Sequence, residues 1–307
     1  MTGLEKALTD YLALRRSMGY KLEDGRLLGQ FVVWLDERGA THVTVSDAVE
    51  WARMAPSGSP NRQAYRLSAV RVFARHLQSV DPRTQVPPTD MLPARKTRAT
   101  PYLYSDAEIL ALLDAARSLA SPLRTATYQT LIALLAVSGM RPGEARRLDL
   151  TDIDFANNAV VIRDTKFGKS REVPLHPTTI AALRSYLGRR DRHPLPSHEQ
   201  AVFISSTGIR LPASTMIGVF RKLARRAGLP HGATGRRPRM HDLRHTFAIR
   251  TLIDAYRTAQ DIERQITLLS TYLGHVDPTS TYWYLSATPE LMALAGDRLE
   301  RYAKECS

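Results

Sequence analysis

The chain has 307 residues, 43% hydrophobic and 24% charged, a globular balance with enough apolar material for two cores. Its formal net charge of +13 favours a polyanionic partner, either a nucleic acid or an anionic membrane surface. The sequence has no apolar run of transmembrane length, no signal peptide and no lipidation motif, and its lone cysteine, Cys306, excludes a disulfide framework and a thiolate metal cluster. We therefore expect a cytoplasmic protein that binds nucleic acid rather than membrane.

The first third of the chain is predicted to be a small helical domain. Apolar side chains recur on one helical face over residues 3–18, Asp24 is positioned to cap a second helix, and Thr44 a third. Ser59, followed by proline, opens a fourth helix. We place this domain at residues 1–81.

Residues 82–103 are predicted to form an extended basic linker. Five prolines between positions 82 and 101 prevent a continuous helix. The cations Arg95, Lys96 and Arg98 lie among them. They are interpreted either as a solvated loop or as a contact to a polyanion.

The second domain, residues 104–307, is predicted to be mainly α-helical with a small β-hairpin or sheet. A capping box opens its first helix at Ser105, and a strongly apolar helix stops at Gly139, a residue that adopts the left-handed conformation easily. Residues 159–162 and 171–175 are predicted to be the two strands of a hairpin. Further helices are expected at 177–187, 212–227, 239–256, 259–273 and 289–303, the last amphipathic and opened by Thr288 and Pro289.

Four local patterns in this domain carry side chains suited to chemistry. They are Arg141 with Glu144 three residues on; Lys166 and Lys169 in the hairpin turn; His241, Arg244 and His245 on one predicted helix; and His275 followed nine residues later by Tyr284. Each alone has an ordinary explanation as a surface charge, a solubilising lysine or a packed aromatic ring. Their value lies in their order along the chain.

In that order the patterns resemble the signature of the tyrosine recombinases, the phage integrase, Xer and Cre group. The resemblance spans about residues 104–290 by motif. The helical first domain is similar only in kind to the SAM-like core-binding domain of that family. The resemblance implies that the second domain is an α+β catalytic domain. It also implies that the protein is a site-specific recombinase or integrase that exchanges strands between two DNA sites. The role would be integration, transposition or resolution of a mobile element or replicon.

The same resemblance implies partners and single-residue roles. Double-stranded DNA, a homotetramer on that DNA, and related recombinases or accessory proteins are the implied partners; no cofactor is implied, and the protein would associate with the nucleoid. The family pattern assigns phosphate binding to Arg141 and Arg244, the hairpin lysine to Lys166, the histidine positions to His241 and His275, the nucleophile to Tyr284, and supporting roles to Glu144 and His245.

Physical chemistry agrees with this assignment. Attack on a phosphodiester concentrates negative charge on the non-bridging oxygens, for which two guanidinium groups supply rigid paired donors. A tyrosine hydroxyl, with an ordinary pKa near 10, needs a base or nearby positive charge, and His241 is the best candidate by residue type. A mobile lysine such as Lys166 can give the departing oxygen its proton. With these cations around the phosphate, no metal ion is required.

Several alternatives stay open at this point. Tyr282 lies two residues before Tyr284, and only the spacing to His275 favours Tyr284. A non-catalytic DNA-binding protein, a metallohydrolase built on His241, His245 and His275, and a type IB topoisomerase are the competing functions. The 30 residues between Arg244 and His275 are more than the family pattern predicts. Expected DNA contacts outside the motifs are Arg95, Lys96, Arg98, Lys169, Arg236, Arg237 and Arg239.

Overall fold

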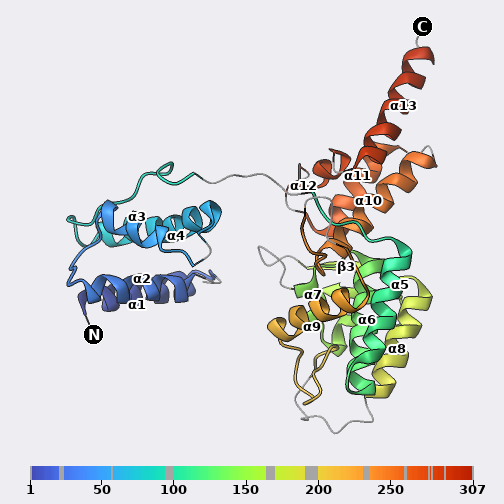
Figure 1. Ribbon diagram of the computed structural model, residues 1–307, viewed down its shortest axis with the longest axis horizontal. Helices are drawn as coiled ribbons and strands as arrows, with labels where there is room; N and C mark the ends of the chain where they lie inside the picture. The colour runs from blue at the N-terminus through green and yellow to red at the C-terminus, as the bar shows by residue number, and fades with distance from the viewer. Residues whose placement is uncertain are drawn as a thin grey trace. The chain divides into compact units, whose positions relative to one another are not determined.

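The computed structural model describes residues 2–20, 24–56, 58–93, 100–163, 170–190, 200–230, 235–258, 261–275, 277, 279–286 and 288–305. The chain divides into two compact units, Met1–Arg98 and Ala99–Ser307, each with its own hydrophobic core (Figure 1). The predicted fold class, mainly helical with a small sheet, is confirmed.

The first unit contains the four helices predicted for it. They are α1 (Gly3–Ser17), α2 (Gly25–Glu37), α3 (Val45–Arg53) and α4 (Pro60–Gln78). Aromatic side chains from three of them fill the centre of the core: Phe31, Trp51 and Phe73 are almost fully buried. The rings of Phe31 and Trp51 pack with their centroids 5.0 Å apart, which ties α2 to α3.

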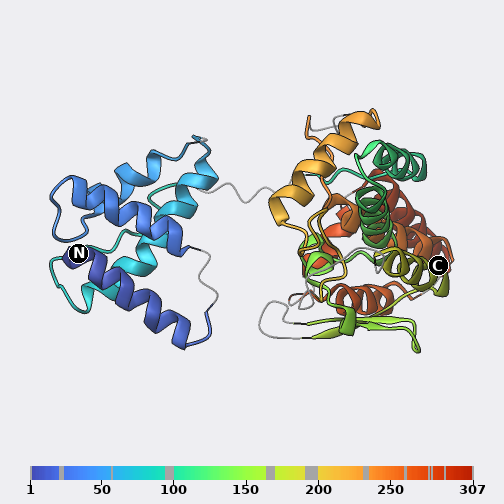
Figure 2. The same cartoon turned by 90° about the horizontal axis from the view of Figure 1, so that it is seen from below.

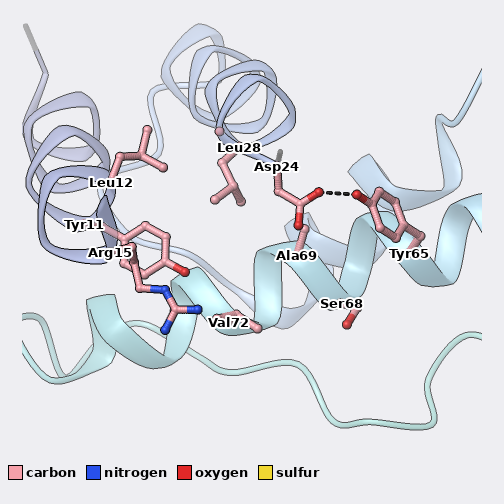
Figure 3. Close-up of a pocket in the computed structure, with 10 residues that line it drawn as sticks. Tyr11, Leu12, Arg15, Asp24, Leu28, Tyr65, Ser68, Ala69 and Val72 are labelled. Atoms are coloured by element: carbon pink, nitrogen blue, oxygen red, sulfur yellow. Dashed lines mark hydrogen bonds between the residues drawn. The ribbon is translucent and has the colours of Figure 1, made fainter. Parts of the chain in front are cut away.

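Asp24 stands at the start of α2, but its side chain does not cap that helix as predicted. Its carboxylate instead accepts a hydrogen bond from the Tyr65 hydroxyl of α4, at a cavity of about 170 Å³ lined by α1, α2 and α4 (Figure 3). Arg15 of α1 lines the same cavity, with its guanidinium carbon 3.6 Å from the ring centre of Tyr20. Asp24 therefore links two helices across the unit.

Residues 82–93, predicted as part of the extended linker, pack on the first unit. Leu92 is buried in its core, and the Arg71 Nε donates a hydrogen bond to the Pro87 carbonyl at 2.7 Å. At the other end of the predicted linker, Tyr104 is buried in the core of the second unit. The linker cations lie outside the described residues, so their contact with DNA stays a prediction: Arg95, Lys96 and Arg98.

The second unit is a helical body with a sheet at one edge (Figure 2). Its helices are α5 (Asp106–Ala115), α6 (Pro122–Ser138), α7 (Pro142–Arg147), α8 (Pro177–Arg190), α9 (Ala213–Arg226), α10 (Asp242–Arg257), α11 (Ile262–Leu273), α12 (Thr279–Tyr282) and α13 (Pro289–Glu305), with a 3₁₀ turn, η4 (Trp283–Ser286), after α12. The antiparallel sheet has the order β1 (Ile153–Asp154), β2 (Ala159–Ile162) and β3 (Arg171–Pro174). The hairpin of β2 and β3 is confirmed, whereas β1 and α7 were not predicted.

Helix α10 lies between two apolar clusters of this unit. Leu243 near its start packs with the cluster formed by α5, α6, α8, α9 and the sheet. Ile249 and Leu252 pack instead with residues of α11, η4 and α13. The first turns of α10 therefore lie where the two clusters meet, which brings its polar residues close to the ends of α6 and α11 (Figure 1).

Candidate active site

A left-handed glycine at the end of α6 positions the first arginine of the site. Gly139 has φ +59°, as predicted for a helix C-terminus, and an added Cβ would lie 2.4 Å from Cδ1 of Phe247. After this turn Arg141 stands at the N-terminal boundary of α7. Its Nη2 donates a hydrogen bond of 3.3 Å to the Gly274 carbonyl, just past α11.

Arg244, in the first turn of α10, is anchored at the same two helix ends. Its Nη1 donates to the Gly139 carbonyl at 2.9 Å and its Nη2 to the Leu273 carbonyl at 2.8 Å. Burial and the neighbouring charge of Arg141 lower its pKa to about 10, so it stays protonated at neutral pH. Two guanidinium groups of like charge are thus held together, an arrangement that a bound anion would stabilise.

Glu144 holds Arg141 in place, as its position three residues later suggested. Its Oε1 accepts a hydrogen bond of 2.7 Å from Arg141 Nη1, and its Oε2 accepts one of 2.9 Å from the Arg141 main chain. Burial alone would raise the pKa of Glu144, but hydrogen bonds and charge from Arg171 and Arg141 outweigh it and lower the pKa to about 2. The carboxylate is only 3% exposed.

Arg171 is the member of this cluster that the sequence analysis missed. It opens β3, donates to Glu144 Oε2 at 2.8 Å through Nη2, and donates to the Tyr272 carbonyl at 2.9 Å through Nε. It also packs against Gly274, where an added Cβ would lie 2.9 Å from its Nη1. Arg171 therefore joins the sheet, α7 and the end of α11. A signal in the sequence was the arginine directly after the hairpin turn, at the first residue of a strand.

Tyr284 is brought to this cluster by η4, and it contacts a histidine of α10. Its side chain is 2% exposed, and its hydroxyl lies 3.0 Å from Nδ1 of His245. Tyr282 is 50% exposed at the end of α12. The two tyrosines thus differ in exposure, and Tyr284, which the spacing to His275 favours, is the one that lies beside His245.

The two remaining histidines flank Tyr284 and His245. His241, at the N-terminal boundary of α10, meets the His245 ring edge-on with a centroid distance of 5.0 Å. Burial first, and Arg244 second, lower the pKa of His241. His275 follows α11, with its Nδ1 2.7 Å from the Thr281 hydroxyl and its ring 6.3 Å from that of Tyr284 at 24°.

The remaining cations that the sequence analysis named fall into three groups. Lys166 and Lys169 lie outside the described residues, so the structure does not place the hairpin lysine. Arg236 and Arg237 are exposed. Arg239 is engaged locally, because its Nη2 pairs at 2.7 Å with the buried carboxylate of Asp242. If Arg239 also contacts DNA as predicted, its guanidinium would have to bind a phosphate while it stays paired with Asp242.

Two further observations concern the described residues alone. Within the described ranges, no three histidine, cysteine, aspartate or glutamate side chains come together in a way that could hold a metal ion. No helix of these ranges combines the length and apolarity needed to cross a membrane.

Comparison with known proteins gives matches over nearly the whole chain. The model of the phage integrase family matches residues 103–290. A putative integrase/recombinase of Sinorhizobium fredii is 45% identical over 308 residues, covering 98% of each chain. Tyrosine recombinase XerD of Mycobacterium tuberculosis is 29% identical over 91% of each. Among solved structures, the Tn1549 transposon integrase in complex with transposon right end DNA has a TM-score of 0.66 at 19% identity and covers 99% of this chain and 100% of that one.

Proposed function

The chain belongs to the phage integrase family and is a tyrosine recombinase, and on that premise we propose that it cuts DNA through a covalent 3′-phosphotyrosyl bond to Tyr284 without a metal ion. One observation carries the proposal. Arg244 donates hydrogen bonds to the carbonyl oxygens of Gly139 and Leu273. These residues lie two positions before Arg141 and His275, and Tyr284 contacts His245 of the same helix. Segments far apart in the chain thus place two cations, three histidines and a tyrosine together.

The proposed reaction uses these side chains and, for Lys166, the role that the family pattern assigns to the hairpin lysine. The scissile phosphate binds Arg141 and Arg244, which donate hydrogen bonds to its non-bridging oxygens as charge builds on them. Tyr284 gives its proton to His241, the base that residue type favours, as its Oη forms a bond to phosphorus and the bond from phosphorus to the 5′ oxygen breaks. The leaving 5′ oxygen takes a proton from Lys166. The 5′ hydroxyl of a partner strand then attacks the phosphotyrosyl bond and releases Tyr284.

Strand exchange between two DNA sites requires two subunits on each site, so we propose a homotetramer on DNA as the active assembly. The surplus of positive charge supports binding to the phosphate backbone. The choice among integration, transposition and resolution depends on which DNA sites are used, and base contacts of single side chains decide that.

A nicked suicide substrate tests the proposal. Tyr284→Phe should bind the DNA but form no covalent adduct, whereas Tyr282→Phe, the matched control at an exposed tyrosine, should form it at the wild-type rate. Cleavage should also persist in EDTA. Adduct formation by the Tyr284→Phe variant, or cleavage that stops in chelator and returns with zinc or magnesium, would contradict the mechanism. Relaxation of supercoiled DNA without strand exchange would indicate a topoisomerase instead.

A further inference from the structure

The last carbonyl groups of α11 accept hydrogen bonds from arginines of three different segments. Helix C-termini carry unpaired carbonyl groups and the negative end of the helix dipole, so cations bind there favourably. The three contacts are those of Arg171 Nε to Tyr272 at 2.9 Å, Arg244 Nη2 to Leu273 at 2.8 Å and Arg141 Nη2 to Gly274 at 3.3 Å. Two of these arginines bind the phosphate in the proposed reaction, and the third, Arg171, takes no part in it.

The guanidinium of Arg171 is occupied by the protein itself. Besides the Nε contact, its Nη1 and Nη2 donate hydrogen bonds of 3.2 and 2.8 Å to the two carboxylate oxygens of Glu144. The side chain is 13% exposed. Because each of its three nitrogens is bonded to another group of the chain, Arg171 is placed to hold these groups rather than to bind a phosphate.

Arg171 and Arg141 share the carboxylate of Glu144. Its Oε1 accepts a hydrogen bond of 2.7 Å from Arg141 Nη1 and one of 3.2 Å from Arg171 Nη1, so the carboxylate lies between two guanidinium groups. Glu144 is only 3% exposed, so water cannot replace either partner. Without Arg171, the carboxylate would be held by Arg141 alone and would turn with it.

Arg171 also supports the second contact of Arg141. It packs against the turn after α11, where a Cβ added to Gly274 would lie 2.9 Å from Arg171 Nη1 and 3.2 Å from its Cδ. Gly274 is the residue whose carbonyl accepts the hydrogen bond from Arg141 Nη2. Arg171 therefore contacts both groups that hold the guanidinium of Arg141, the carboxylate of Glu144 and the backbone at Gly274.

Resting on the function proposed above, we propose that Arg171 is a positioning residue for DNA cleavage, which orients Arg141 toward the scissile phosphate by fixing Glu144 and the end of α11. In this role Arg171 does not touch the DNA. Paired hydrogen bonds from a guanidinium to phosphate oxygens require a defined plane. A misplacement of about 1 Å in such a group costs about 10²-fold in rate. Arg171 therefore acts on the rate of the chemical step and not on the affinity for DNA.

Arg171→Lys in the full-length protein tests the assignment. An ammonium group still neutralises Glu144, but it has no planar fork with which to bind Glu144 and the Tyr272 carbonyl together. The midpoint of thermal unfolding should stay within about 4 °C of the wild type. At saturating suicide substrate, adduct formation should slow by about 10²-fold, with half-site binding unchanged. Arg117→Lys, the same substitution at an exposed arginine just after α5, should cleave like the wild type.

A double-mutant cycle separates positioning of Arg141 from a general structural role. Arg141→Lys replaces the guanidinium by an ammonium group that has no plane for Arg171 to set. In the Arg141→Lys background, Arg171→Lys should therefore slow adduct formation by less than about threefold, whereas a residue that acts independently of Arg141 would show its full effect in both backgrounds.

Three outcomes would overturn the assignment. The first is an Arg171→Lys rate within about threefold of the wild type, far short of the loss expected from a misplaced guanidinium. The second is an equal loss in both backgrounds, which is also the result if the variant unfolds, and which would leave Arg171 with a role in folding alone. The third is weakened half-site binding with an unchanged rate at saturation, which would make Arg171 a DNA contact. If the wild-type protein itself forms no adduct at Tyr284, the proposed function fails and not the assignment of Arg171.

Discussion

The buried carboxylate of Glu144 should make the stability of the second unit depend on pH. Its pKa is lowered from 4.5 to about 2, and at 3% exposure solvent screens it little. A difference of that size corresponds to roughly 3 kcal/mol of stability at pH 7. Because the folded-state pKa is the lower one, this stability is present above pH 4.5 and is lost as pH falls toward 2. About 1.5 kcal/mol of it should be gone at pH 3.5.

Glu144→Gln is the perturbation that isolates this effect. At pH 7 the variant leaves Arg171, whose side chain is 13% exposed, without its carboxylate, and we expect a loss of about 3 to 5 kcal/mol. The matched control is Glu172→Gln, an exposed glutamate that follows Arg171 on β3, which should change stability by less than about 0.5 kcal/mol.

Urea unfolding followed by peptide-resolved hydrogen exchange measures the free energy of unfolding of the second unit separately from that of the first. The difference between wild type and Glu144→Gln should shrink by about 1.5 kcal/mol between pH 7 and pH 3.5, because the wild type loses its carboxylate contribution and the variant has none to lose. A difference that stays constant over this range, or a variant as stable as Glu172→Gln, would refute the reasoning.

Three further predictions concern the leaving group, DNA binding and the turn after α6. Lys166→Ala should slow cleavage far more than Lys169→Ala, and a 5′-bridging sulfur should rescue it; equal defects would indicate only electrostatic contact with DNA. Neutralising the three linker cations should weaken binding to all sequences alike and reduce the slope of log affinity against log salt by about 0.9 for each phosphate that is no longer neutralised; an unchanged slope with altered sequence preference would contradict this. In thermal unfolding, Gly139→Ala should cost about 2 kcal/mol or more, because its left-handed backbone and the Phe247 ring leave no room for a methyl group, whereas Gly188→Ala, inside α8 with open space around it, should be neutral or slightly stabilising; equal effects would contradict the strain.

Local signals in the sequence predicted the features that depend on near neighbours. The capping box at Ser105 forms as expected, with its main-chain N–H and that of Glu108 each bonded to the other's side chain. The helix end at Gly139 has the predicted left-handed backbone. Both outcomes are set within four residues of chain, where capping and backbone sterics dominate.

Individual contacts between distant segments could not be predicted from local sequence patterns. Arg171 pairs with Glu144, which lies 27 residues earlier in the chain, because the hairpin packs against α7. No local pattern encodes that contact. Asp24 has the right position to cap α2, yet its carboxylate instead accepts a hydrogen bond from the hydroxyl of Tyr65, 41 residues later in the chain. Tertiary contacts override local preference in both cases. The contact between Tyr284 and His245 likewise depends on how η4 packs against α10, and no local pattern encodes that packing.

The C-terminal helix α13 has an anchored first turn and a second half of which residues 297–300 and Lys304 are exposed. Leu291 is fully buried in the same apolar cluster as Tyr284, and Glu290 pairs with Arg257 of α10 at 2.7 Å. Leu299, in the second half of α13, is 70% exposed. Figure 1 shows the C-terminal part of α13 extending beyond α10 and α11. The amphipathic helix expected at 289–303 therefore packs on its own domain through Leu291.

Two truncations should therefore behave differently. Removing the residues after Ala287 deletes Leu291. This should lower the free energy of unfolding by about 2 to 5 kcal/mol and disturb the apolar cluster in which Tyr284 packs. Removing only those after Ala295 keeps that anchor. If the exposed half docks on a neighbouring subunit, this shorter protein should bind a half-site and form the covalent adduct normally, yet lose cooperative binding to a full site and strand exchange, because assembly then no longer couples the subunits. Gel-shift titrations on half and full sites measure the binding. Wild-type cooperativity after the Ala295 truncation would show that α13 serves its own chain alone.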